Sequence, residues 1–202
     1  IGAGALENQN FTGGQDAYNV AVGYQAGNDI TTGTANTLIG GLAGDALTTG
    51  HSNVAIGYAA LSSEDEHGGN VAIGKDALTV QNAGAHAYNV AVGHNAGAAV
   101  TTGVQNTIIG GLAGDALTTG SYNVALGYFA LTSEDGHGRN VAIGRAALKS
   151  LNAGADAFNV AVGMEAGQTM TTGVHNTILG GSAGDALTTG SGSVALGYNA
   201  LG

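Results

Sequence analysis

Short apolar runs recur along the whole chain, each opened by a polar amide and closed by a glycine. The unit reads NVAIG at Asn70 and Asn140 and changes little elsewhere, and the interval between successive units is always 17 or 19. The opening residues are Asn19, Asn36, Asn53, Asn70, Asn89, Asn106, Asn123, Asn140, Asn159 and Asn176, with Ser193 in the eleventh place. A regular unit of this length is too short for a pair of helices, and it is typical of one coil of a β-solenoid.

The units are themselves grouped into a longer repeat of four units. Three intervals of 17 and one of 19 repeat, which gives a longer period of 70, and the super-repeats begin near 19, 89 and 159. An alanine follows seven residues after every opening position, and the residue after that alanine alternates in pairs between Gly and Leu. We therefore treat 1–202 as a single repeat array. Fragments of interrupted units at 1–2 and 200–202 indicate an excerpt from a longer chain.

The predicted fold is all-β, a parallel β-solenoid of the β-roll or β-helix kind whose coils follow the intervals of 17 and 19. Helices are disfavoured by the frequent glycines and by the β-branched residues of the apolar runs. Each coil is expected to hold a strand such as 54–56, a turn at Gly57, a second short strand around 60–61 and a closing loop. Eleven coils stacked at about 4.8 Å make a rod on the order of 50 Å long.

Residue alternation divides each strand between two faces, and both faces are apolar. In the unit at Asn70, Val71 and Ile73 share one face and Ala72 lies on the other. The Ile73 position is always large and apolar, so we expect it to fill the solenoid interior. The Ala72 position is never polar, and a strand that is apolar on both sides is usually covered on both. We therefore expect a second copy to cover the alanine face in a parallel homo-oligomer, with a trimer favoured.

The opening asparagines have a structural explanation. Stacked on one another from coil to coil, their side-chain amides can form a hydrogen-bonded ladder along the rod axis. We expect the ten asparagines from Asn19 to Asn176 to do this.

Composition narrows the classes of partner. The chain has 38 Gly, no Pro, Cys or Trp, 14 acidic and 4 basic side chains, and a formal net charge of −10. An acidic chain without a basic patch is not expected to bind nucleic acid. The absence of cysteine excludes disulfides and thiolate sites, and no apolar run is long enough for insertion into a membrane.

Two related loops carry residues that could bind a metal ion. Their sequences are SEDEHG and SEDGHG, one super-repeat apart, and the candidate ligands are Glu64, Asp65, His67, Glu134, Asp135 and His137. Carboxylates in a turn can hold Ca²⁺, and histidine suits a transition metal. The alternative is an acidic, solvated loop, and no other cofactor is expected.

No other pattern specifies chemistry. Asp45, Asp115 and Asp185 lie four coils from one another and are expected to cap turns. His51, His86, His94 and His175 share no spacing and are expected to be exposed in loops. With no nucleophile motif present, we predict no catalytic residues and no enzyme activity. Thr-Thr pairs such as 48–49 suggest ice binding, although they occur on only two coils in four.

The stretch NTIIGGLAGDALTTGSYNVALGYFAL, from Asn106 to Leu131, resembles repeats of phage tail fibres. More loosely, the NVAIG strands resemble the head repeats of trimeric autotransporter adhesins, whose unit is shorter. The resemblance covers the whole chain. It implies a trimeric, extracellular shaft or head of a virion tail fibre, with attachment to a host glycan or receptor. The alternatives are a cell-surface adhesin or matrix filament, an ice-binding solenoid, and a glycan depolymerase on a solenoid scaffold.

Overall fold

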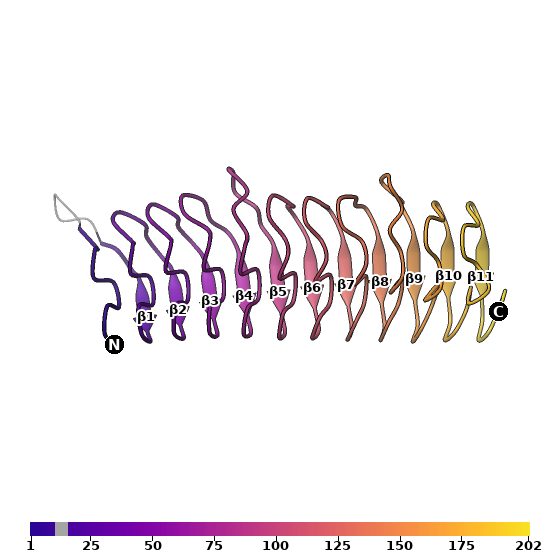
Figure 1. Cartoon of the computed structure of the whole chain (residues 1–202), viewed down its shortest axis with the longest axis horizontal. Coiled ribbons are helices and arrows are strands. Elements are labelled where there is room, and N and C mark those ends of the chain that lie inside the picture. The colour runs from indigo at the N-terminus through magenta and orange to yellow at the C-terminus, as the bar shows by residue number, and fades with distance from the viewer. Residues whose placement is uncertain (11–15) are drawn as a thin grey trace.

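The computed structural model describes residues 1–10 and 16–202 as a β-solenoid with one short strand in each coil (Figure 1). Eleven short strands form a single parallel sheet in sequence order. The strands are β1 (Val20–Val22), β2 (Thr37–Ile39), β3 (Val54–Ile56), β4 (Val71–Ile73), β5 (Val90–Val92), β6 (Thr107–Ile109), β7 (Val124–Leu126), β8 (Val141–Ile143), β9 (Val160–Val162), β10 (Thr177–Leu179) and β11 (Val194–Leu196). The predicted fold class is confirmed.

The second strand expected in each coil is not formed. Residues 58–63 are a run of turns, and the equivalent segments of the other coils are turns as well. Left-handed backbone at alternate positions, such as Ala59 (φ 52°) and Leu61 (φ 51°), prevents an extended conformation there. The coils still bond to one another through this wall, for example from Leu61 N to Ala77 O at 3.0 Å.

The register between coils is constant in spite of the two loop lengths. Ala55 pairs with Ala72 across the shorter interval, and Ala72 pairs with Ala91 across the longer one. The additional residues of the longer interval project from the rod as protruding loops, visible after β4 and after β8 in Figure 1. A Cβ on Gly84, in the first of these loops, would meet nothing within 4 Å.

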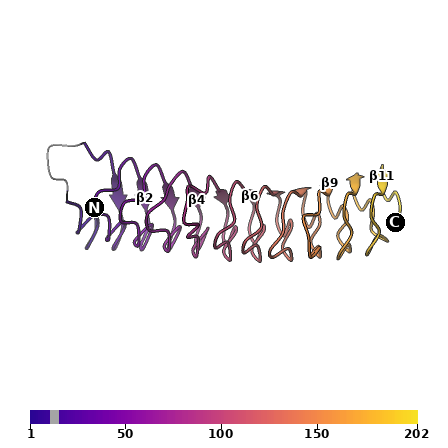
Figure 2. The same ribbon diagram turned by 90° about the horizontal axis from the view of Figure 1, so that it is seen from above.

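A column of glycines forms the corner that follows each strand. Gly57 has a φ of +137°, and a Cβ there would overlap the carbonyl oxygen of Gly74 in the next coil. Two factors therefore require glycine at this corner: the positive φ, and the close approach of the neighbouring coil, which leaves no room for a Cβ. Turned by 90°, the rod shows the strands gathered along one side (Figure 2).

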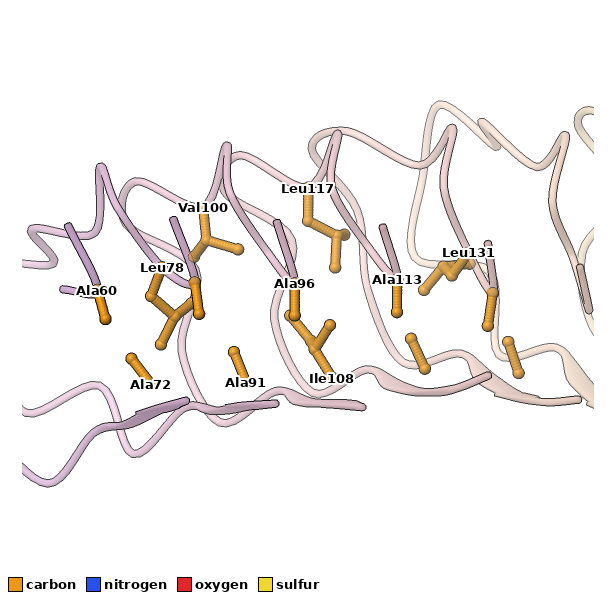
Figure 3. Close-up of a cluster of buried hydrophobic side chains, with 14 of the residues drawn as sticks. Ala60, Ala72, Leu78, Ala91, Ala96, Val100, Ile108, Ala113, Leu117 and Leu131 are labelled. Atoms are coloured by element: carbon orange, nitrogen blue, oxygen red, sulfur yellow. The ribbon is translucent and has the colours of Figure 1, made fainter. Parts of the chain in front are cut away.

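The two faces of the strand lie opposite to the prediction. In all eleven strands the middle residue is buried and both flanking residues are half-buried or exposed. Ala72, Ala91 and Ile108 point inward, toward Leu78 and Ala96 of the opposite wall (Figure 3). The alanine class therefore fills the solenoid interior, and the Ile73 class points out of it. Small residues face the interior because the wall opposite the strands is close to them and fills the interior with its own large side chains.

Those large side chains explain the four-coil period. The second coil fills the interior from its strand with Leu38, whereas the third and fourth fill it from the opposite wall with Leu61 and Leu78. Where Leu38 points inward, the wall carries glycine. A Cβ on Gly27 would lie 2.6 Å from Leu38 Cδ1, and one on Gly44 would lie 2.8 Å from Leu38 Cδ2. The alternation between Gly and Leu is thus volume compensation between successive layers of the core.

Candidate functional site

The outward face of the sheet is an uncharged apolar stripe that runs the length of the rod. We call it the Val/Ile stripe, defined as the first and third residues of β1 to β11. Its members are Val, Ile or Leu except for Thr37, Thr107 and Thr177. None of them is buried, and the exposed fraction reaches 41% at Leu126 inside the array. The stripe has the same period as the coils.

Aromatic side chains accompany the stripe in two further columns. One column directly precedes the ladder residue and includes Tyr88, Tyr122 and Phe158, and the other follows the corner glycine and includes Tyr58 and Tyr128. All five side chains are exposed large hydrophobics. They enlarge the apolar surface on both sides of the strands, and the sequence reasoning missed both columns.

The first aromatic column stacks from coil to coil. Arg139 Cζ lies 4.9 Å from the ring centroid of Tyr122 and 5.5 Å from that of Phe158. Phe158 in turn stacks on His175, with centroids 5.6 Å apart and planes 6° from parallel. Aligning the units by their asparagines places these four residues at one position, which is the signal that could have found them.

The asparagines form a ladder inside the rod, with backbone groups as the partners. Each side-chain oxygen from Asn19 to Asn176 accepts a hydrogen bond from the backbone N–H of the next ladder residue, as Asn53 N donates to Asn36 Oδ1 at 2.9 Å. Most Nδ2 groups donate to a carbonyl of the next coil, as Asn36 does to Gly50 at 2.8 Å. Asn70 is an exception, because its buried Nδ2 has no partner. The ladder therefore has a structural role. Where both the Oδ1 and the Nδ2 bonds form, the side-chain amide is fully used within the rod and is not available to a ligand.

The two acidic loops bring their candidate ligands together. Glu64, Asp65 and His67 each offer an atom within 4.8 Å of the others, and Glu134, Asp135 and His137 do the same. Glu64 and Glu134 are fully buried, and burial raises the pKa of both carboxyl groups. These glutamates are therefore not part of a solvated loop, although Asp135 is exposed.

Carboxylate and imidazole face each other in both loops. Glu64 Oε1 accepts a hydrogen bond from the backbone N–H of His67 at 3.2 Å and lies 3.7 Å from His67 Nδ1. The corresponding distances between Glu134 and His137 are 3.2 and 3.5 Å. The Nδ1 atoms of both histidines are buried and have no hydrogen-bond partner.

Two further histidines gather beside the first loop. The ring centroids of His51 and His86 are 4.8 Å apart, and those of His67 and His86 are 6.1 Å apart. His86 Nδ1 accepts a hydrogen bond from Gly68 N at 3.1 Å. In the next super-repeat Asp156 Oδ1 takes the equivalent bond from Gly138 N, also at 3.1 Å. His51 and His86 are exposed, as predicted, and they also lie against each other, with His86 held by a hydrogen bond from Gly68.

The recurring threonines bond between coils, whereas two of the three recurring aspartates are half-buried and have an oxygen without a partner. Asp45 and Asp115 are half-buried and Asp185 is exposed, and burial raises the pKa of Asp45 and of Asp115. The first threonine of a pair bonds to the next coil, as Thr48 Oγ1 does to Asp65 O at 3.2 Å. These hydroxyls are hydrogen-bonded within the rod and do not form a free array.

Neither a cleft nor a spanning helix is found in the part of the chain that the structure describes. Residues 1–10 and 16–202 enclose no pocket, and none of them forms a helix of the length and hydrophobicity needed to cross a bilayer. Comparison with protein-family models, with curated proteins and with solved structures found no match to this chain.

Proposed function

We propose that the chain is a non-enzymatic structural segment of an extracellular fibre that assembles from parallel copies through the Val/Ile stripe. The observation that carries the proposal is the stripe itself. It is continuous over eleven coils, free of charge and never buried. Exposed apolar surface of this extent on a soluble protein marks an interaction site, and parallel sheets are normally covered on both faces.

The occupant that fits the stripe best is a second copy of the same chain. Side chains repeat along the stripe once per coil, so a complementary surface needs the same spacing over the same length. An identical rod laid parallel and in register meets this condition at every coil. The oligomer expected from the sequence is retained, but the contacting face is the Val/Ile stripe and not the alanine face. Three copies remain our preferred number, on the resemblance to tail-fibre and adhesin repeats.

Within this class, we favour the shaft or head of a phage tail fibre that takes part in host attachment, with a glycan or receptor on the host surface as partner. A cell-surface adhesin or matrix filament of the same architecture is the second candidate. Ice binding is not carried forward, because the Thr-Thr pairs occur on only two coils in four and the first hydroxyl of a pair, as at Thr48, is bonded to the next coil.

Sedimentation equilibrium of the purified chain tests the assembly. We expect an oligomer for the wild type and a monomer for the double variant Ile73→Lys/Ile143→Lys, since each lysine introduces a charge into the stripe. Asn82→Lys adds a charge at an exposed loop residue and serves as the control that should remain oligomeric. A wild-type monomer at tens of micromolar, well folded by circular dichroism, would refute the proposed assembly.

The non-enzymatic character has its own test. Incubation of the purified oligomer with bacterial capsular polysaccharides, followed by a reducing-end assay, should release no new ends. Cleavage would indicate a site formed between copies and would favour the depolymerase alternative.

A further inference from the structure

Two glutamates occupy a position that belongs to the hydrophobic core. Eleven residues after each ladder asparagine, the coil directs a side chain into the rod, and in six coils this fully buried residue is apolar. These six are Ile30, Leu47, Val100, Leu117, Leu151 and Met170. The third coil of each of the first two super-repeats has Glu64 or Glu134 there, also with no exposed surface. A buried carboxylate is costly unless it is paired, hydrogen-bonded or bound to a metal.

The hydrogen bonds within the rod leave one oxygen of Glu64 without a partner, whereas each oxygen of Glu134 accepts one backbone N–H. Glu64 Oε2 is buried and has no partner, and Glu64 Oε1 receives only the backbone N–H of His67. Glu134 Oε2 receives the N–H of Ala153 at 3.3 Å. In both loops the Nδ1 atom of the histidine, buried and without a partner, lies beyond hydrogen-bond distance of the carboxylate that it faces.

The spacing suits an ion placed between them. Two ligand atoms of a tetrahedral ion bound at about 2.0–2.1 Å lie about 3.3–3.4 Å apart. The distances of 3.7 and 3.5 Å between carboxylate oxygen and imidazole nitrogen approach that value. A carboxylate oxygen of Asp65 or Asp135 completes each group within 4.8 Å. Neither aspartate is buried, and Oδ1 of each accepts a hydrogen bond from the next backbone N–H, which leaves Oδ2 for an ion.

We propose that Glu64, Asp65 and His67, and equivalently Glu134, Asp135 and His137, bind divalent transition-metal ions of the zinc class, two per chain. One imidazole nitrogen with two carboxylates is a donor set for zinc. Calcium takes six to eight oxygen ligands, which these loops do not offer among the described residues. Water completes the coordination, and the partly exposed rings of His67 and His137 give access from solvent.

The surroundings of the two sites differ in a way that makes the ligand set testable. His51 and His86 lie near the first site, whereas Ser121 and Asp156 stand at the corresponding positions near the second. His86 Nδ1 is engaged by Gly68 N, as Asp156 is by Gly138 N. We therefore take the ligand set to be the three residues that the two sites share, and substitution of His51 or His86 tests this choice.

Equilibrium dialysis of the untagged chain against zinc chloride, with the metal measured by mass spectrometry, tests the proposal. We expect two ions per chain for the wild type, one for His67→Gln, one for His137→Gln and none for the double variant. His51→Ala and His86→Ala should still bind two. X-ray absorption of the zinc-loaded wild type should show one imidazole per ion with oxygen ligands, a readout that needs no variant to fold.

Three results would overturn this site. They are zinc retention by the folded double variant, an absence of bound zinc on the wild type at 100-fold excess over protein, and loss of an ion on substitution of His51 or His86. None of them bears on the oligomer, which sedimentation measures separately.

Discussion

The side chain of Asn106 connects two coils through opposite ends of its amide. Its Oδ1 accepts a hydrogen bond from Asn123 N at 2.9 Å, and its Nδ2 donates one to Gly120 O at 2.9 Å. Asn106 is almost fully buried, so neither backbone group has water as a substitute. All ten ladder asparagines accept the first of these bonds and most also donate the second, so they satisfy backbone groups that would otherwise lack partners inside the rod.

The ladder predicts a graded loss of stability. Asn106→Ala removes both bonds and should lower the free energy of unfolding by about 2–3 kcal/mol, because two buried backbone groups lose their partners. Asn70→Ala is the matched control, since its Nδ2 has no partner, and it should cost about 1 kcal/mol less. Urea unfolding followed by circular dichroism measures both. Equal losses would mean that the Nδ2 bond contributes nothing.

The direction of the strand faces can be tested within one strand. Ala91→Leu adds volume to the closed interior and should destabilise the fold by about 1–3 kcal/mol. Val92→Leu, one residue later, adds one methylene on the outward face and should be nearly neutral. Thermal unfolding of the two variants compares them directly. If Val92→Leu destabilised the fold more than Ala91→Leu, Val92 and not Ala91 would face the interior.

The glycine corner predicts a contrast between two glycines with positive φ. A Cβ added at Gly93 would overlap Gly110 O of the next coil, whereas one at Gly84 meets nothing within 4 Å. Gly84→Ala should therefore cost only the left-handed strain of about 1–2 kcal/mol. Gly93→Ala should cost more, because the stacked coils must separate. Chemical denaturation provides the comparison, and similar losses would argue against close stacking at the corner.

The half-buried aspartates predict a pH dependence. Burial raises the pKa of Asp45 and of Asp115, so the folded state binds a proton more readily than the unfolded chain does. The ionised groups therefore destabilise the fold at pH values above their folded pKa, and this penalty disappears as the pH falls below the unfolded value. Asp45→Asn/Asp115→Asn should raise the free energy of unfolding at pH 7, because a neutral amide does not carry the desolvation cost of an ionised carboxylate.

At pH 3 the same double variant should differ little from the wild type. Asp185→Asn is the control, because this residue is exposed at the equivalent position of the third super-repeat and should change little at either pH. Urea titrations at both pH values decide the matter. A larger benefit of the double variant at pH 3 than at pH 7 would contradict the sign.

Much of the candidate metal site was visible in the sequence, but its burial was not. The loop SEDEHG is polar throughout, which favours a solvated surface. Glu64 is nevertheless a core residue, because it aligns with Leu47 and Val100 of other coils. Aligning the coils by their asparagines shows two acids, Glu64 and Glu134, and one amide, Gln81, at a position that is otherwise apolar. The mismatch is not visible when the loop is read by itself.

The periodicity of the sequence determined the stack of coils, the position of each strand and the register, because identical units bury their backbone groups best when stacked in line. Alternation also divided each strand into two apolar faces. Only the tertiary structure decided that Ala72 points into the rod and Ile73 out of it. That choice depends on how far away the opposite wall stands and on which side chains it supplies. Leu61 and Leu78 fill the interior from that wall, so alanine fits inside and the larger residues form the outward stripe.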